Sequence, residues 1–259
     1  MYWLLCGIGL FILIAAGDCL VKGAVNLSLK IGIPPLIVSL TIVAFGTSAP
    51  ELLVAVNATL SGSSGIAIGN VVGSNTANIL LVLGLPAFLK ALDTSEFDAK
   101  KTYYFMMVAS FVFIAMAFTG GFGSWQAAVL LFMLVIFLLS NLKDAGVQRS
   151  LDTNKCETNA FELKGQDPLI AGWRIALFLI LGLVGLPLGA DVLVDNASLI
   201  ARSFGISEAV IGLTLIAIGT SLPELATAIV SVFRNQADVA LGNVIGSNIF
   251  NLLGIIGVT

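Results

Sequence analysis

Two short segments combine residues that could bind a cation within an otherwise apolar chain. Residues 46–51 read GTSAPE and residues 219–224 read GTSLPE. Each segment places two hydroxyl groups and a glutamate within about one turn of a helix. Its proline lacks a backbone donor and clashes with the carbonyl one turn earlier. We therefore expect the first helix to loosen near 44–47, so that carbonyl oxygens converge with the oxygens of Thr47, Ser48 and Glu51.

A second pair of segments follows the first at the same interval. Residues 69–78 read GNVVGSNTAN and residues 242–251 read GNVIGSNIFN. Residues spaced four apart share one face of a helix, so each segment presents one polar face, formed by Asn70, Ser74 and Asn78 or by Asn243, Ser247 and Asn251. The paired glycines, Gly69 with Gly73 and Gly242 with Gly246, predict close contact with a neighbouring helix.

Together these segments offer carboxylate, hydroxyl, amide and carbonyl oxygens, with a charge of −2 from Glu51 and Glu224. Such an all-oxygen set suits a hard cation, and its flexibility favours calcium over magnesium. Sodium could occupy the same oxygens, and two protons could neutralise the same carboxylates. One site that competing cations fill is the chemical basis of exchange, because an empty, doubly charged site is costly to move across a membrane.

The composition determines where these segments lie. Of the 259 residues 58% are hydrophobic and 10% charged, whereas a soluble chain carries about 25% charged residues. The mean hydropathy is +1.05, and continuous apolar runs of about twenty residues recur, each long enough to cross a bilayer. The sequence predicts an all-α polytopic membrane protein. It contains no histidine, and Cys6, Cys19 and Cys156 have no metal-ligand spacing, which excludes zinc peptidases and histidine relays.

We expect eight transmembrane spans, separated mostly by short turns. The longest polar stretch, 143–169, predicts a linker between a first half, 1–142, with five spans and a second half, 170–259, with three. The expected spans are 2–26, 36–60, 66–89, 102–119, 124–142, 170–200, 209–233 and 238–259.

The two halves contain an internal repeat. Residues 36–85 align without gaps with 209–258, at a constant offset of 173. Five spans separate equivalent helices, and because five is odd the copies must face opposite ways. This predicts an inverted-topology repeat, the architecture of many secondary transporters. Counterparts of the fourth and fifth spans do not follow in the second half, so eight of an expected ten helices are present.

The distribution of basic residues predicts the orientation. With the N-terminus outside, eleven of the twelve lysines and arginines fall on the cytoplasmic side, and Arg202 alone falls outside. Positive charge is enriched on the cytoplasmic side of membrane proteins. We therefore expect a multi-pass protein of the plasma membrane or a bacterial inner membrane, with the linker 143–169 in the cytoplasm.

The repeated GTSxPEL segment, followed each time by GNxxGSNxxN, resembles the α-repeats of the cation/calcium exchanger superfamily. The resemblance covers 36–85 and 209–258, and the layout of the flanking spans. It implies a ten-helix antiporter with four ion sites at the midplane and with its first and sixth spans as sliding, gating helices. Gly17, Gly182, Gly185 and Gly189 in those spans fit mobile segments.

The resemblance also implies a ligand set on the matching positions. Glu51 and Glu224 are the shared acidic ligands in this comparison, and the remaining roles fall to hydroxyl, amide and backbone oxygens. Some relatives, including potassium-dependent ones, have aspartate at the position of Asn251. The implied ligands besides the glutamates are Thr47, Ser48, Thr220 and Ser221, the carbonyls of Ala44 and Ala217, and Ser74, Asn78, Ser247 and Asn251.

The sequence therefore predicts a secondary active antiporter that exchanges Na⁺ for Ca²⁺ by alternating access at a midplane site. We expect no cofactor beyond the transported ions, with H⁺ or K⁺ as alternative coupling ions, the lipid bilayer as surroundings and no nucleic acid as partner. An H⁺/Ca²⁺ antiporter is the close alternative. A cation channel and an intramembrane enzyme are more remote, since a channel gives no reason for a deep acidic site in two inverted halves and no protease motif is present.

Overall fold

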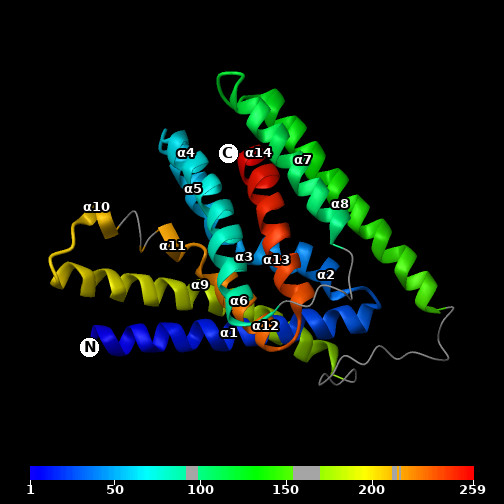
Figure 1. Ribbon diagram of the computed structural model, residues 1–259, viewed down its shortest axis with the longest axis horizontal. Helices are drawn as coiled ribbons and strands as arrows, with labels where there is room; N and C mark the ends of the chain where they lie inside the picture. The colour runs from blue at the N-terminus through cyan, green and yellow to red at the C-terminus, as the bar shows by residue number, and fades with distance from the viewer. Residues whose placement is uncertain (92–98, 154–169, 212–214, 216) are drawn as a thin grey trace.

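The computed structural model describes residues 1–91, 99–153, 170–211, 215 and 217–259 (Figure 1). Every regular element within these ranges is a helix, which confirms the predicted all-α class. The expected linker 143–169 lies in part outside the described residues. Its first eleven residues continue the helix that we expected to end at residue 142, and the role of 143–169 as a linker stays a prediction.

The two longest helices, α1 (Tyr2–Ile31) and α9 (Gly172–Ser203), lie side by side, across the group formed by α4, α5 and α13 (Figure 1). They run antiparallel: Gly9 of α1 faces Leu193 of α9, whereas Gly23 faces Leu179. A core of leucine and alanine side chains, including Leu20 and Leu186, is buried between them.

Glycines let the backbones of α1 and α9 approach each other closely. A Cβ atom at Gly9 would lie 2.8 Å from the backbone nitrogen of Leu193, and one at Gly182 would lie 2.5 Å from the Cβ of Leu20. These two contacts are counterparts at the offset of 173. Gly185 and Gly189 meet α1 in the same way, and Gly17 meets the backbone of Ala226 in α12. In the structure these glycines allow close packing between helices, and their place in mobile segments stays a prediction.

The first predicted site segment lies on a broken helix. It consists of α2 (Pro35–Val38), a π-helical turn η1 (Ser39–Val43), α3 (Ala44–Thr47) and α4 (Ala49–Leu60). The two parts meet at Ser48 and are bent by 45°. Our prediction of a loosened stretch at 44–47 was wrong in position. Those residues stay helical, with the Ser48 N–H donating to the Ala44 carbonyl at 3.1 Å, and Pro50 lies in the first turn of a new helix, where no N–H is needed.

The second copy repeats this local geometry. It contains α10 (Glu208–Ile211), α11 (Ala217–Gly219) and α12 (Leu222–Phe233). The bounds of α12 equal those of α4 shifted by 173. The residues before the two helices, Ser48 and Ser221, have similar dihedral angles, with φ −84° and ψ 8° in the first copy and φ −91° and ψ 3° in the second.

The second site segment also forms corresponding elements. In the first copy these are α5 (Ser64–Ala77), the π-helical η2 (Asn78–Leu83) and α6 (Gly84–Leu89). In the second they are α13 (Ala237–Ile249), the π-helical η4 (Phe250–Ile255) and α14 (Ile256–Val258). A single π-helical turn therefore begins at or next to the last asparagine of the motif in both copies.

The predicted glycine contacts are present in one copy. A Cβ at Gly246 would lie 2.6 Å from the Leu40 carbonyl oxygen, so α13 packs backbone to backbone against η1. Around Gly69 and Gly73 no described atom lies within 4 Å of such a Cβ. Their partners by the repeat are residues 209, 212, 213 and 217, of which 212 and 213 are not described, so close packing there stays a prediction.

The remaining helices, α7 (Lys100–Ala117) and α8 (Ser124–Thr153), lie side by side and pack against α13, η4 and α14 (Figure 1). The core on this side includes Met106, Phe113 and Phe137. Lys101 forms an ion pair with Asp144 of α8, so the helix beyond residue 142 is tied to α7.

Length and composition identify most of the expected spans. Five described helical stretches can each cross a membrane, and the bent pair Pro35–Thr47 and Ala49–Leu60 makes a sixth: the five are Tyr2–Ile31, Ser64–Leu89, Ser124–Gly146, Gly172–Ser203 and Ala237–Val258. The expected spans 102–119 and 209–233 coincide with α7 and with α10–α12. Neither is among the spans identified by length and composition, because α7 begins with two lysines and because 209–233 includes undescribed residues. The number of eight transmembrane spans therefore stays a prediction.

The α1–α9 contact predicts different effects on stability for two glycine substitutions. Gly182→Ala should lower the free energy of unfolding by about 1–3 kcal/mol, because the added methyl group overlaps the Leu20 backbone. Gly7→Ala is the matched control, since nothing lies within 4 Å of its Cβ, and should leave stability unchanged or raise it. Thermal unfolding in detergent measures both. A Gly182→Ala protein as stable as the control variant would show that this contact does not contribute.

Candidate cation-binding site

Glu51 and Glu224 occupy equivalent places in the first turns of α4 and α12. Both side chains are 0% exposed. A carboxylate is favoured at the N-terminus of a helix because the free N–H groups there carry partial positive charge. The two interrupted helices therefore bring two carboxylates, each in a favourable backbone environment, to the interior of the protein.

The segment Ser48–Glu51 has the pattern of a capping box, in which a serine and a glutamate three residues later cap a helix start. The structure shows that this pattern is not used for capping. Ser48 makes no cap hydrogen bond, and its hydroxyl donates to Glu224 Oε1 at 3.2 Å. The serine of one copy thus contacts the glutamate of the other.

Several buried oxygens in this region have no hydrogen-bond donor. Among the described residues, nine buried side-chain polar atoms lack a partner, and six of them are oxygens of predicted ligands: Glu51 Oε1 and Oε2, Asn78 Oδ1, Ser221 Oγ, Glu224 Oε2 and Asn251 Oδ1. A buried acceptor without a partner is costly, and a charged one more so. A positively charged ligand would satisfy such a concentration of acceptors.

Within the part of the chain that the structure describes, no lysine or arginine forms an ion pair with these carboxylates. The ion pairs found there are Lys22 and Arg234 with Asp18, and Lys101 with Asp144. No cluster of three or more acidic, histidine or cysteine side chains exists among the described residues either. A metal ion at Glu51 and Glu224 would therefore take its other ligands from neutral oxygens, as calcium and sodium readily do.

Hydrogen bonds connect the two copies around the carboxylates. Thr47 Oγ1 donates to Asn243 Oδ1 at 3.1 Å, and Ser247 Oγ lies 3.4 Å from the Ala44 carbonyl oxygen. Thr47 Oγ1 lies at the same distance from that carbonyl. The oxygens of Ala44, Thr47 and Ser247 thus converge at the contact between α3 and α13. The Ala44 carbonyl is not free, as we had expected it to be, because it accepts the Ser48 N–H.

The asparagines meet in a second contact. Asn251 Nδ2 donates to Ser74 Oγ at 3.1 Å, and Asn70 Nδ2 donates to the Glu51 carbonyl oxygen at 3.2 Å. Ser74, Asn78, Ser247 and Asn251 are all buried. The polar faces predicted for the two helices therefore meet inside the protein.

Two predicted ligands are located by their backbone only. Ala217 begins α11, and Thr220 follows this helix, next to Ser221. Of the twelve predicted ligands, the other ten lie in the buried region defined by Glu51, Glu224 and the two asparagine motifs.

The sequence prediction overlooked Asn75 and Asn248. Asn75 Nδ2 donates to the Asn248 carbonyl oxygen at 3.1 Å, and Asn75 Oδ1 accepts from Asn251 Nδ2 at 3.0 Å. Asn248 Oδ1 accepts from Asn78 Nδ2 at 3.2 Å. The signal was present as the repeated GSN triplet, but spacing by four selected only its serine.

These features define a class: a multi-pass membrane protein with a buried, acidic group of oxygen acceptors, whose relatives are transporters rather than enzymes. The profile of the family described as sodium/calcium exchanger protein matches residues 1–143 and 174–259. The chain therefore belongs to the sodium/calcium exchanger family.

Individual relatives agree with this assignment. The chain is 38% identical to "Inner membrane protein YrbG" of Escherichia coli over 96% of this chain and 76% of the relative. It is 32% identical to "Sodium/calcium exchanger MaX1" of Methanosarcina acetivorans, over 97% and 80%. A solved sodium/calcium exchanger from Methanococcus jannaschii superimposes with a TM-score of 0.80 at 32% identity, over 99% of this chain and 79% of that one.

The lack of donors around Glu51 predicts a gain of stability when its charge is removed. In metal-free buffer at pH 8, Glu51→Gln should unfold at a temperature equal to or higher than that of the unmodified protein, because a buried charge costs several kcal/mol. For a chain of this size each kcal/mol corresponds to about 2–4 °C. The exposed Asp191 of α9 supplies the control, Asp191→Asn, which should leave the unfolding temperature unchanged. A clear loss of stability in Glu51→Gln would mean that the carboxylate has a donor in the folded protein.

Proposed function

We propose that the protein exchanges sodium for calcium across the membrane by alternating access at the site around Glu51 and Glu224. The observation that carries this proposal is the buried pair of carboxylates with unpartnered oxygens, supplied by two copies of one motif. The charge of −2 balances one calcium ion or two monovalent cations. Because either cation can satisfy the same oxygens, the two ions compete for one site, and competition couples their movements.

The proposed ligands are those expected from the sequence. Glu51 and Glu224 supply the charge, and Asn78 and Asn251 supply amide oxygens that lack donors. The hydroxyls of Thr47, Ser48, Ser74, Ser221 and Ser247 lie in the same buried region. Thr220 and the carbonyl of Ala217 enter this set through the repeat. The relatives add support, since a related exchanger has been solved after soaking with Na⁺ and Ca²⁺.

Alternating access requires two halves that can exchange roles, and the inverted repeat would supply them. We propose that 1–142 and 170–259 form the two halves. The antiparallel course of α1 and α9, which the offset of 173 makes counterparts, supports this arrangement. Because glycines let the backbones of α1 and α9 pack closely against each other, we propose that the two helices slide across the core as one unit.

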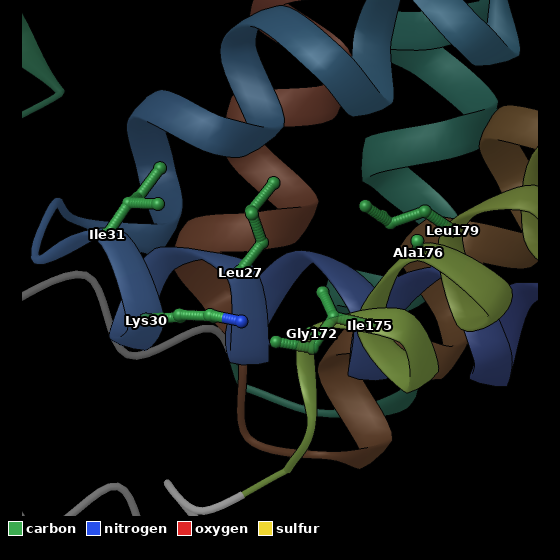
Figure 2. A pocket seen from close by; sticks show the side chains of 7 residues that line it. All are labelled: Leu27, Lys30, Ile31, Gly172, Ile175, Ala176 and Leu179. Carbon is green, nitrogen blue, oxygen red and sulfur yellow. The ribbon is translucent and has the colours of Figure 1, made fainter.

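We also propose that the N-terminus lies outside and the linker 143–169 in the cytoplasm. Basic residues assigned to the cytoplasm meet in the structure. Lys22 and Arg234 both contact Asp18, and Lys90 Nζ donates to Asn235 Oδ1 at 2.7 Å. Lys30 extends along a pocket to Gly172 at the start of α9 (Figure 2). Arg202, the one basic residue assigned to the outside, lies at the opposite end of α9.

Calcium flux in proteoliposomes tests the exchange directly. With imposed sodium, proton or potassium gradients, we expect saturable calcium uptake that an outward sodium gradient drives. Glu51→Gln and Glu224→Gln should each abolish it, because each removes half of the site's charge, whereas Asp191→Asn should retain it. Uptake that follows a proton gradient but ignores sodium would establish the H⁺/Ca²⁺ alternative. Large uncoupled currents would instead indicate a channel.

Asn251 provides a separate test of the ligand set. Its Oδ1 is buried without a donor, so Asn251→Asp should place an additional negative charge on the cation. We expect tighter calcium binding or an altered preference among Na⁺ and K⁺, measured by calorimetry and by flux under each gradient. An ion profile identical to that of the unmodified protein would show that Asn251 does not contact the ion.

A further inference from the structure

We propose that Asn75 and Asn248 are positioning residues that fix the side-chain amides of the ligands Asn251 and Asn78. This inference rests on the proposed function and deepens it. Each positioning residue belongs to one copy of the repeat and holds the ligand of the other. The geometry points to this role because both ligand nitrogens are hydrogen-bonded, whereas both ligand oxygens are buried without a donor.

An asparagine ligand can bind a cation in only one of two orientations. The amide oxygen is an acceptor, whereas the amide nitrogen carries two hydrogens and would repel a cation. Rotation about the last side-chain bond is soft and roughly two-fold, so the side chain itself does not choose between them. The choice must come from groups that bond the nitrogen.

In one contact the orientation can be followed back to the backbone. The Asn248 carbonyl can only accept, so the Asn75 nitrogen, 3.1 Å away, must face it. The oxygen of Asn75 then faces the nitrogen of Asn251 at 3.0 Å. The second hydrogen of that nitrogen goes to Ser74 Oγ at 3.1 Å. Both hydrogens are used, and Asn251 Oδ1 is left buried without a donor.

The reciprocal contact fixes Asn78. The nitrogen of Asn248 lies 3.8 Å from the sulfur of Met106 in α7, and its oxygen accepts from Asn78 Nδ2 at 3.2 Å. Asn78 Oδ1 is buried without a donor, as Asn251 Oδ1 is. Asn75 and Asn248 are themselves counterparts at the offset of 173, so the two contacts repeat one device.

The same region contains the carboxylates that the ligand amides would complement. Asn70, about two turns before Asn78 on the same polar face, donates to the backbone carbonyl of Glu51. Ser74 contacts Asn251. The positioned amides are thereby connected to both halves of the site without contributing charge, and their orientation determines whether two neutral oxygens are available to the ion.

A paired substitution separates positioning from general packing. An aspartate offers an oxygen in either orientation, so it needs no positioning partner. Asn248→Ala should weaken calcium binding about 10–100-fold, the usual loss when a partner of a metal ligand is removed. In a chain that already carries Asn78→Asp, the same Asn248→Ala change should weaken binding less than about three-fold.

The second contact gives an independent version of this experiment. Asn75→Ala should weaken calcium binding about ten-fold, at the lower end of the range for such partners, because Ser74 still holds one hydrogen of Asn251. In the Asn251→Asp background the loss should again nearly vanish. Asn57→Ala is the matched control, since Asn57 is exposed on α4 and should leave affinity unchanged in every background.

Calorimetry with calcium on the purified full chain measures these affinities, and unfolding temperature shows that each variant is folded. Equal losses in the asparagine and aspartate backgrounds would overturn the inference, as would unchanged affinity in both Asn248→Ala and Asn75→Ala. If the unmodified chain binds no calcium, the proposed function is wrong and the inference falls with it. That result differs from the two outcomes above, in which the unmodified chain binds calcium and only the inference is overturned.

Discussion

The structure depends on burying two carboxylates without a cationic side chain beside them. Glu51 and Glu224 are fully buried, and the described ion pairs lie elsewhere, around Asp18 and Asp144. A protein can hold such groups only if helix ends, hydroxyls or a bound cation compensate the charge. The interruptions at Ser48 and Ser221 supply the helix ends, since each glutamate lies in the first turn that follows. Each of these helices begins with a proline in its first turn, where no N–H group is needed, so no helical hydrogen bond is lost.

The other elements serve this arrangement. The glycines of α13 bring its backbone against η1, which places Ser247 and Asn243 beside Ala44 and Thr47. The π-helical turns begin at or beside the asparagines that close the motif. The contact of α1 with α9 covers the broken helices, since Gly46 meets Leu183 and Gly219 meets Val194. Small residues thus set how closely the helices approach the polar region.

Much of the fold and of the site could be predicted from the sequence, because the signals were local and repeated. Apolar runs identified the helices, and glutamate with proline and serine identified the two buried carboxylates. Three features could not be predicted. The break fell at Ser48 because proline starts a new helix there, and α8 continued through a polar stretch that an ion pair with α7 supports. The roles of Asn75 and Asn248 arise only from hydrogen bonds between residues 170 or more positions apart.

The separation of the two half-sites also bears on how the protein is made. The hydroxyl of Ser48 bonds to Glu224, and that of Thr47 bonds to Asn243, residues that the ribosome adds much later. At a synthesis rate of about 5–20 residues per second, 173 residues take roughly 10–35 s. During that interval the first glutamate enters the bilayer without the second copy. The newly inserted half must therefore shelter its acidic group from lipid until its counterpart emerges, through a proton, water or the insertion machinery.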